Sequence, residues 1–110
     1  MKAERTKLKN ESLPDKEIIR RNHDIEIRIN FVLIPADEIN DKPESFQYDS
    51  FVVNELSKSA IKQVIIKEKY PSYDDELSAI NSKETDIVKY KIYQDRRLFA
   101  DSIISIIFDE

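Results

Sequence analysis

The chain contains no glycine, although an average usage of about 7% would give about eight in a chain of 110 residues. Glycine provides the sharp turns and close backbone approach of phosphate-binding loops, dinucleotide-binding fingerprints and nucleophile elbows. The composition therefore excludes these three kinds of site. Turns that need a positive φ must use Asn or Asp instead, and a glycine-free chain favours helices and longer loops.

Cysteine is also absent, and histidine occurs once, as His23. The absence of Cys excludes disulfides, thiolate metal sites and thiol catalysis. A single His excludes Ser-His-Asp triads and zinc sites with several His ligands. We therefore expect no catalytic, cofactor or metal-binding residues and a non-enzymatic protein. The missing disulfides favour a cytoplasmic location in a host cell, or a location inside a virion.

Long apolar runs are missing as well. No stretch approaches the roughly 20 apolar residues that a membrane span needs, and the polar start Met1–Arg5 lacks the apolar region of a secretion signal. We expect neither membrane association nor export. A length of 110 residues suits one small domain.

Residues 1–14 fit neither a helical nor a strand period, so we predict a flexible arm there and a single globular domain over residues 15–110. Although the whole chain has a net charge of −4, the arm is basic. The acidic net charge argues against nucleic-acid binding except through the arm. Alternatively, the acidic remainder of the chain mimics the charge of a nucleic acid. The candidate electrostatic residues of the arm are Lys2, Arg5, Lys7 and Lys9.

The segment from Pro14 to Arg21 is compatible with a short helix. From Asp24 onward apolar and polar residues alternate strictly, which predicts a half-buried strand that ends at Pro35. A strand needs a neighbour, and the best one within the chain is Phe46–Tyr48. Alternatively the strand pairs with another subunit or partner. Its apolar face is the first candidate contact surface and contains Ile27, Ile29, Phe31 and Leu33.

Three helices are predicted in the second half of the chain. Asp49 or Ser50 can cap a helix that ends near Tyr70, because Pro71 disfavours helical geometry in the residue before it. Ser72 can cap a short helix through Ile80, and Ser82 can cap a last helix that runs nearly to the C-terminus. The main apolar stripe of this last helix contains Val88, Ile92, Phe99, Ile103, Ile106 and Ile107.

The end of the last helix is apolar over more than one face. Such a helix is usually buried on several sides, so this end is the second candidate contact surface. The alternative is that the predicted strand covers it within one monomer. Its residues are Ile103, Ile104, Ile107 and Phe108.

The acidic triplet Asp74–Glu76 has two interpretations. The acids can stabilise the start of the short helix through the helix dipole, or they can coordinate a hard cation. Consecutive helical residues diverge by about 100°, and no EF-hand spacing surrounds the triplet. We therefore favour a structural role.

The stretch KYPSYDDEL at Lys69–Leu77 is followed by a short helix and then by a helix rich in aromatic residues. Over about residues 51–100 this resembles a recurrent pattern in small uncharacterised phage and prophage proteins, and the later part of the likeness depends on Tyr90, Tyr93, Arg96 and Phe99. The chain departs from the pattern in its more apolar C-terminus. The resemblance implies a phage-encoded structural or accessory protein that works through protein contacts.

We therefore predict a predominantly helical α+β fold with a flexible basic N-terminal arm. One or two strands would pack on a helical hairpin of two long helices joined by a short helix. We expect a non-enzymatic virion or assembly protein that binds a protein partner or self-associates. The alternative is a small acidic inhibitor of a host or defence protein, and a subunit of an enzyme is a third interpretation.

Overall fold

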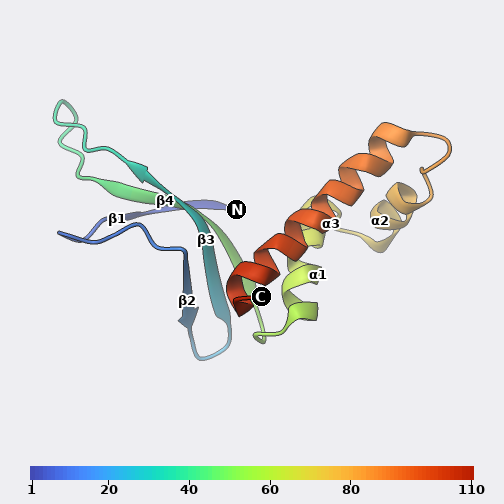
Figure 1. Ribbon diagram of the computed structural model, residues 1–110, viewed down its shortest axis with the longest axis horizontal. Helices are drawn as coiled ribbons and strands as arrows, with labels where there is room; N and C mark the ends of the chain where they lie inside the picture. Colours follow the sequence, from blue (N-terminus) through green and yellow to red (C-terminus); the bar gives the residue numbers. More distant parts are fainter. The chain divides into compact units, whose positions relative to one another are not determined.

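The computed structural model describes residues 1–110, which form two compact units, Met1–Asn54 and Glu55–Glu110. The first unit is a four-stranded antiparallel sheet, and the second consists of three helices (Figure 1). The prediction of a predominantly helical fold with one or two strands is therefore wrong. The prediction of one domain over residues 15–110 stays a prediction.

The sheet has the strand order β1-β4-β3-β2, and every neighbouring pair is antiparallel. Because β3 has a neighbour on each side, it offers no free edge to another chain. The predicted pairing with Phe46–Tyr48 is confirmed, since Leu33 lies opposite Phe46. The strands are β1 (Lys2–Thr6), β2 (Lys16–Arg20), β3 (Ile25–Ile34) and β4 (Ser45–Val53).

The predicted flexible arm contains an edge strand of this sheet. In β1, Lys2 lies opposite Asp49 and Thr6 lies opposite Ser45. The short helix predicted from Pro14 is also wrong, because β2 occupies most of that segment. Both strands are short and rich in charged residues, which is common at sheet edges. Both strands can be recognised only from their pairing with residues that are distant in the sequence.

A β-bulge at Asn30 divides the alternating strand into two parts. Ile29 lies opposite Asp49 but Val32 lies opposite Gln47, so β3 has one extra residue here. Asn30 adopts a φ of 57°, and its Nδ2 donates to Asp49 Oδ2 at 3.1 Å. Because side chains alternate between faces, the extra residue reverses the pattern. The prediction that Ile25 to Leu33 share one face is therefore wrong.

The residues with positive φ confirm how a glycine-free chain makes its turns. All four are Asn or Asp, whose short polar side chains tolerate this conformation best among non-glycine residues. They are Asn10, Asn30, Asp41 and Asp109.

One face of the sheet, here called the inner face, combines aromatic rings with charged groups. Phe31, Phe46 and Tyr48 form a buried cluster, against which Ala3 packs. The Arg5 guanidinium lies 5.1 Å from the Phe46 ring centroid, close enough for a cation–π contact. The bulge is what brings Phe31 to this face.

Arg5 links the two edge strands across the inner face. Its Nη2 lies 2.6 Å from Glu17 Oε2 in β2 and 2.6 Å from Glu11 Oε2 in the β1–β2 connection. In a flat sheet, β1 and β2 would be about 14 Å apart, with Glu17 offset from Arg5 by roughly another 13 Å along the strands. The contact therefore requires a strongly twisted and curled sheet, and Figure 1 shows β3 bending along its length.

A second network lies further along the inner face, around the buried carboxylate of Glu26. Ser50 donates to it at 2.6 Å, Arg21 at 2.6 Å and Arg28 at 3.1 Å. Burial alone raises the pKa of Glu26, but the hydrogen bonds from Arg28, Ser50 and Arg21 outweigh it and lower the pKa to about 2. Ser50, predicted to cap a helix, instead stabilises the sheet.

The helical unit contains α1 (Lys58–Lys69), α2 (Tyr73–Ile80) and α3 (Ile87–Phe108). The end of α1 near Tyr70 is confirmed, but its predicted start is wrong because β4 occupies residues 45–53. Ser72 caps α2 as predicted, since its Oγ accepts the Asp75 N–H at 3.1 Å. Asp86 rather than Ser82 caps α3. No helix is both long and apolar enough to cross a membrane.

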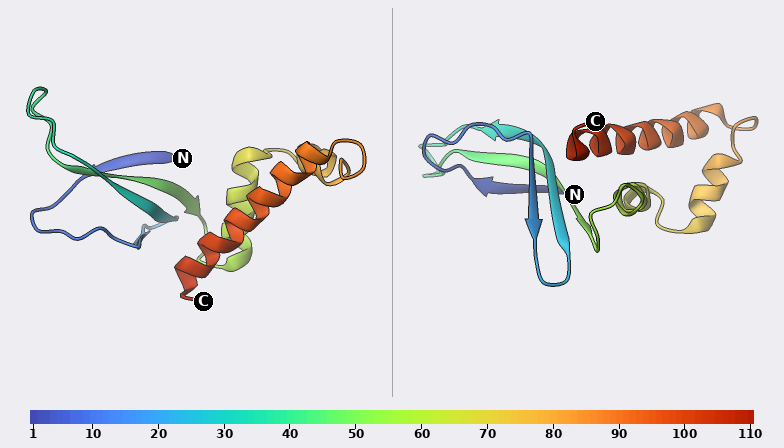
Figure 2. Two further views of the ribbon diagram at one scale, coloured as in Figure 1. Left: turned by 45° about the horizontal axis from the view of Figure 1, so that its top comes forward. Right: turned by 60° about the horizontal axis from the view of Figure 1, so that its bottom comes forward.

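Helices α1 and α3 pack in antiparallel directions, and α2 packs on the N-terminal part of α3 (Figure 2). Lys58 near the start of α1 pairs with Glu110, and Lys62 pairs with Asp101 at 3.0 Å. One turn further along α1, the Ile65 carbonyl accepts a hydrogen bond from Arg96 Nε at 2.9 Å. These contacts fix the register of the hairpin.

Replacing Arg5 should destabilise the protein, contrary to the behaviour of a flexible arm. Arg5→Met keeps an apolar side chain on the rings but leaves Glu11 and Glu17 without their shared cation. We expect the free energy of unfolding, measured in urea, to fall by about 1.5–3 kcal/mol. Lys9→Met, in the exposed loop, is the control and should change it by less than about 0.5 kcal/mol. Equal effects of the two substitutions would contradict the role given to Arg5.

Glu26 should make stability depend on pH in the acid range. A carboxyl with a lowered pKa in the folded state stabilises the protein above its unfolded pKa, near 4.5, and loses this contribution as pH falls to about 2. Thermal unfolding followed by circular dichroism between these pH values should show this loss. Glu26→Gln should flatten the dependence, whereas Glu38→Gln, at an exposed turn, should leave it unchanged.

Candidate functional site

The first predicted contact surface lies mostly in the interior. Ile27 and Ile29 are fully buried and Phe31 is buried, while Leu33 is half exposed. The bulge places Phe31 and Leu33 on the inner face and the two isoleucines on the opposite face. These residues therefore do not form one continuous surface, and their role in contacts stays a prediction.

The second predicted surface is also largely covered. Ile103, Ile104 and Ile107 are buried, and Phe108 is partly buried with the Lys58 ammonium 5.8 Å from its ring centroid. Ile106, on the same end of the helix, is 39% exposed. A contact role with a partner stays a prediction.

Three of the four basic residues of the predicted arm belong to ion pairs within the sheet unit. Lys2 lies 3.1 Å from Asp49, Arg5 binds two glutamates, and Lys7 lies 3.8 Å from Glu44. Lys9 is exposed in the β1–β2 connection. Three of these charges therefore have partners within the sheet unit, and an electrostatic role of the four residues stays a prediction.

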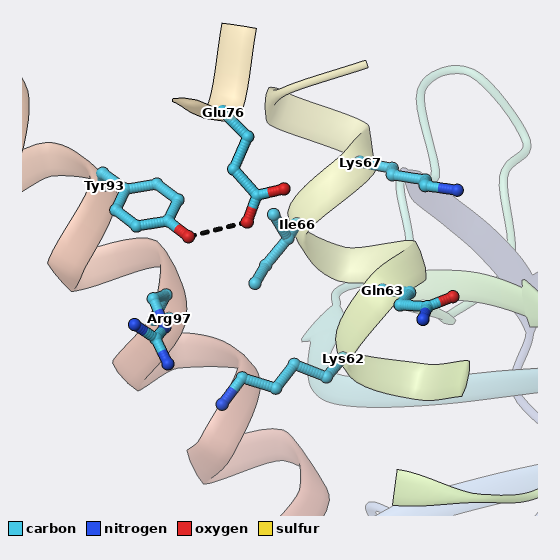
Figure 3. Close-up of a pocket in the computed structure, with 7 residues that line it drawn as sticks. All are labelled: Lys62, Gln63, Ile66, Lys67, Glu76, Tyr93 and Arg97. Carbon is cyan, nitrogen blue, oxygen red and sulfur yellow. Dashed lines mark hydrogen bonds between the residues drawn. The ribbon is translucent and has the colours of Figure 1, made fainter. Parts of the chain in front are cut away.

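The helical unit has an open groove between α1 and α3, here called the α1–α3 groove, with a volume of about 310 Å³ (Figure 3). The Tyr93 hydroxyl points towards α2 and donates to Glu76 Oε1 at 2.6 Å. Ile66 supplies an apolar wall, while Lys62 extends from α1 towards α3, which bears Arg97. Lys67 and Gln63 project away from α3 in this view.

Tyr93 acts in the groove as a hydrogen-bond donor. Burial, together with the hydrogen bond to Glu76, raises its pKa to about 12, so the hydroxyl stays protonated at neutral pH. The ring is buried beside Ile66 and Ala79 and meets Tyr70 edge-on at 5.3 Å. Tyr93 on α3 therefore contacts residues of both α1 and α2, and its hydroxyl does not act as a base near neutral pH.

Three of the residues that line the groove are cations: Lys62, Lys67 and Arg97. Lys62 is shared with Asp101, whereas Arg97 has no carboxylate within ion-pair distance and lies 6.0 Å from the Tyr93 ring centroid. An acidic side chain of a partner could bind at this edge by a charge-assisted hydrogen bond.

The acids at the start of α2 lie where the sequence placed them, and their structural role stays a prediction. Asp74, Asp75 and Glu76 occupy the first helical turn, after the Ser72 cap. Glu76 is turned towards Tyr93. No three His, Cys, Asp or Glu side chains anywhere in residues 1–110 are placed to hold a metal ion.

The main candidate surface is an exposed apolar stripe on α2. Tyr73, Leu77 and Ile80 recur at i, i+4 and i+7 and therefore share one face of the helix. They are 75%, 36% and 42% exposed, whereas Ala79 is the residue that α2 buries. An amphipathic helix normally turns its large apolar side chains inward. Here the small residue faces the core and the large ones face solvent.

The first turns of α3 also expose large apolar side chains. Ile87, Val88 and Ile92 are 53%, 64% and 42% exposed. Helix α2 is held against this part of α3 by the Tyr93–Glu76 bond and by Lys89 Nζ, which donates to Ser78 Oγ at 2.6 Å. We call these exposed side chains of the two packed helices the α2–α3 patch; its members are Tyr73, Leu77, Ile80, Ile87, Val88 and Ile92.

Sequence reasoning missed the α2–α3 patch because it assigned Val88 and Ile92 to the main apolar stripe of the last helix, together with residues that are buried. The side chains that α3 buries are different ones, with Tyr93 and Ala100 among them. The spacing of Tyr73, Leu77 and Ile80 was a signal for the exposed stripe, but a period does not tell which face of a helix meets solvent.

Comparison with protein families, with characterised proteins and with solved structures gives no significant match. The function must therefore be inferred from the surfaces described above.

Tyr93→Phe should weaken the packing of the three helices. It leaves Glu76 without its tyrosine donor, and we expect the free energy of unfolding at neutral pH to fall by about 1 kcal/mol. Because the folded state holds this proton more tightly than the unfolded state, the contribution is complete below pH 10 and disappears as pH rises to about 12. Urea unfolding at several pH values measures it. Tyr73→Phe changes an exposed ring, and it should alter neither the free energy of unfolding nor its dependence on pH.

Proposed function

We propose that this protein is a non-enzymatic structural or accessory protein that works by binding other protein chains. The α2–α3 patch is the observation on which the proposal depends. The resemblance to small phage and prophage proteins suggests that these chains belong to a virion or to its assembly. The protein would then act in the host cytoplasm or in the particle.

Exposed apolar surface of this kind is characteristic of binding sites. Single exposed apolar residues are ordinary, but groups of large ones on adjacent elements mark interaction surfaces. The α2–α3 patch supplies six such side chains from two helices. Its tyrosine and aliphatic residues lie on regular helices, so little conformational entropy is lost when a partner covers them.

The most strongly perturbed carboxyl groups support a structural use of charge. The pKa of Glu11 is lowered to about 2, chiefly by its hydrogen bond from Arg5 and further by the Leu8 N–H. Glu26 is held in the same way by two arginines and a serine. Perturbed pKa values often mark catalytic groups, but structural ion pairs produce them as well. Each of these carboxylates has its cation partner in the sheet.

The second candidate function, a small acidic inhibitor, is favoured by the turn between β3 and β4. Ile39 is 95% exposed at this turn. Asp37 Oδ1 accepts the N–H groups of Ile39 and Asn40 at 3.1 and 3.3 Å, so the turn is ordered. Acidic Glu38 and Asp41 stand beside the isoleucine. A preformed turn of this composition suits an apolar pocket with a basic rim.

The two functions predict different binding partners. A double substitution, Leu77→Asp with Ile80→Asp, should remove the protein from purified particles in which the wild-type chain is present in stoichiometric amount. Quantitative mass spectrometry of particles measures this effect. Ile39→Asp is the control, because it adds a charge at an exposed apolar residue in the other unit.

The opposite result would favour the inhibitor. In that case the wild-type protein is absent from particles and forms a complex with one host protein, and Ile39→Asp abolishes this complex. Circular dichroism and thermal unfolding of each variant establish that it is folded. A folded double variant that enters particles as well as the wild type would overturn the proposed function.

A further inference from the structure

We propose that the α1–α3 groove binds an acidic segment of a protein partner, in which an aspartate or glutamate lies beside an aliphatic residue. In this complex the carboxylate lies between Lys62 and Arg97, and the aliphatic group lies against Ile66 and the Tyr93 ring. The inference goes beyond the proposed function, because it assigns a second binding surface, made of other residues than the α2–α3 patch, and states the chemistry of its partner.

Lys62 and Arg97 are neighbours across the groove. Lys62 Nζ on α1 lies 3.0 Å from Asp101 Oδ1 on α3, and Asp101 lies one helical turn after Arg97 on the same side of α3. Both cations line the groove, and Figure 3 shows the Lys62 side chain extending from α1 towards α3. A lysine and an arginine on facing helices can therefore bind the two oxygens of one carboxylate.

The apolar part of the groove adjoins these two cations. Tyr93 lies one turn before Arg97 on α3, and Ile66 lies one turn after Lys62 on α1. Both line the groove, and the Arg97 guanidinium is 6.0 Å from the Tyr93 ring centroid. One helical turn is about 5.4 Å, so the acidic and aliphatic groups of the ligand belong to residues close together in its sequence.

Charge makes the groove select an acid rather than a base. Three of the seven residues that line it are cations, although the whole chain has a net charge of −4. The one acid among them, Glu76, accepts the Tyr93 hydroxyl at 2.6 Å and lies at the α2 end of the groove. The other end therefore attracts a carboxylate and repels an ammonium group.

The size of the groove limits what it holds. Its volume of about 310 Å³ is at the lower end of the range for ligand pockets, about 300–1,000 Å³. It admits one or two side chains of a partner rather than a whole helix. Asp101 also competes with the ligand for Lys62. We therefore expect weak and reversible binding that salt reduces.

A peptide titration followed by NMR spectroscopy tests the site. The probe is the peptide Ala-Glu-Leu-Glu-Ala, acetylated and amidated at its ends, and it is added to the isotope-labelled full chain. The backbone amide signals of the groove residues in α1 and α3 should shift in a saturable way. Replacing both glutamates of the probe by glutamine, or its leucine by alanine, should weaken binding.

Substitutions in the groove should change the affinity in both directions. Arg97→Gln should raise the dissociation constant of the probe about two- to five-fold, the effect of losing an ion pair at an exposed site. Asp101→Asn should lower it by a similar factor, because Lys62 then loses its competing partner. A variant that only disturbs the fold would not gain affinity.

Control variants lie on the same helix but outside the groove. Lys91→Gln removes an exposed cation of α3, and Asp95→Asn removes an exposed acid. Neither residue lines the groove. Both variants should bind the probe as the wild type does.

Three results would overturn the proposal. The groove amides could stay unshifted at every peptide concentration, or the glutamine peptide could bind as well as the probe. Inorganic phosphate could also bind the groove as tightly as the probe, which would indicate a general anion site. These results leave the α2–α3 patch untouched, because its test measures incorporation into particles and does not involve the groove.

Discussion

The sheet unit depends on one cation, the guanidinium of Arg5. It is anchored in the first strand and reaches Glu17 in the second, although β4 and β3 lie between these strands in the sheet. This link adds to the twist that strands and the bulge at Asn30 produce, and it favours the curl that places β1 and β2 within reach of each other. The curl in turn encloses Phe31, Phe46 and Tyr48 on the inner face. Charge and aromatic packing therefore support one another, because the rings shield the ion pair from water and the ion pair holds the rings together.

The elements best predicted from sequence are those whose signals are local. The cap at Ser72 depends on residues close together in the sequence, and the end of α1 depends on Pro71. The strand from Ile25 was recognised from its period. The start of α1 was wrong because β4 has apolar residues on both faces, with Tyr48 on one and Phe51 on the other, and this pattern resembles neither regular period.

The missed elements depend on distant partners. The strands β1 and β2 contain few large apolar residues, and their pairing becomes evident only when Lys2 is seen opposite Asp49 and Ile18 opposite Ile27. The exposed residues of the candidate site were not predicted, for a related reason. Leu77 and Val88 belong to helices that were correctly expected, but their exposure depends on which faces Tyr93 and Ala79 occupy in the packed hairpin. Periodicity locates an apolar face, whereas packing decides whether that face is covered.

The bulge at Asn30 has a further consequence, for the folding of the sheet. A slip of β3 by one residue against β4 would move the left-handed conformation onto Ile29 or Phe31. A left-handed backbone costs such residues about 1–2 kcal/mol, whereas asparagine adopts it readily. The slip would also break the bond between Asn30 and Asp49. A single asparagine therefore selects one alignment of the two central strands during folding, which an alternating run of similar apolar residues could not do by itself.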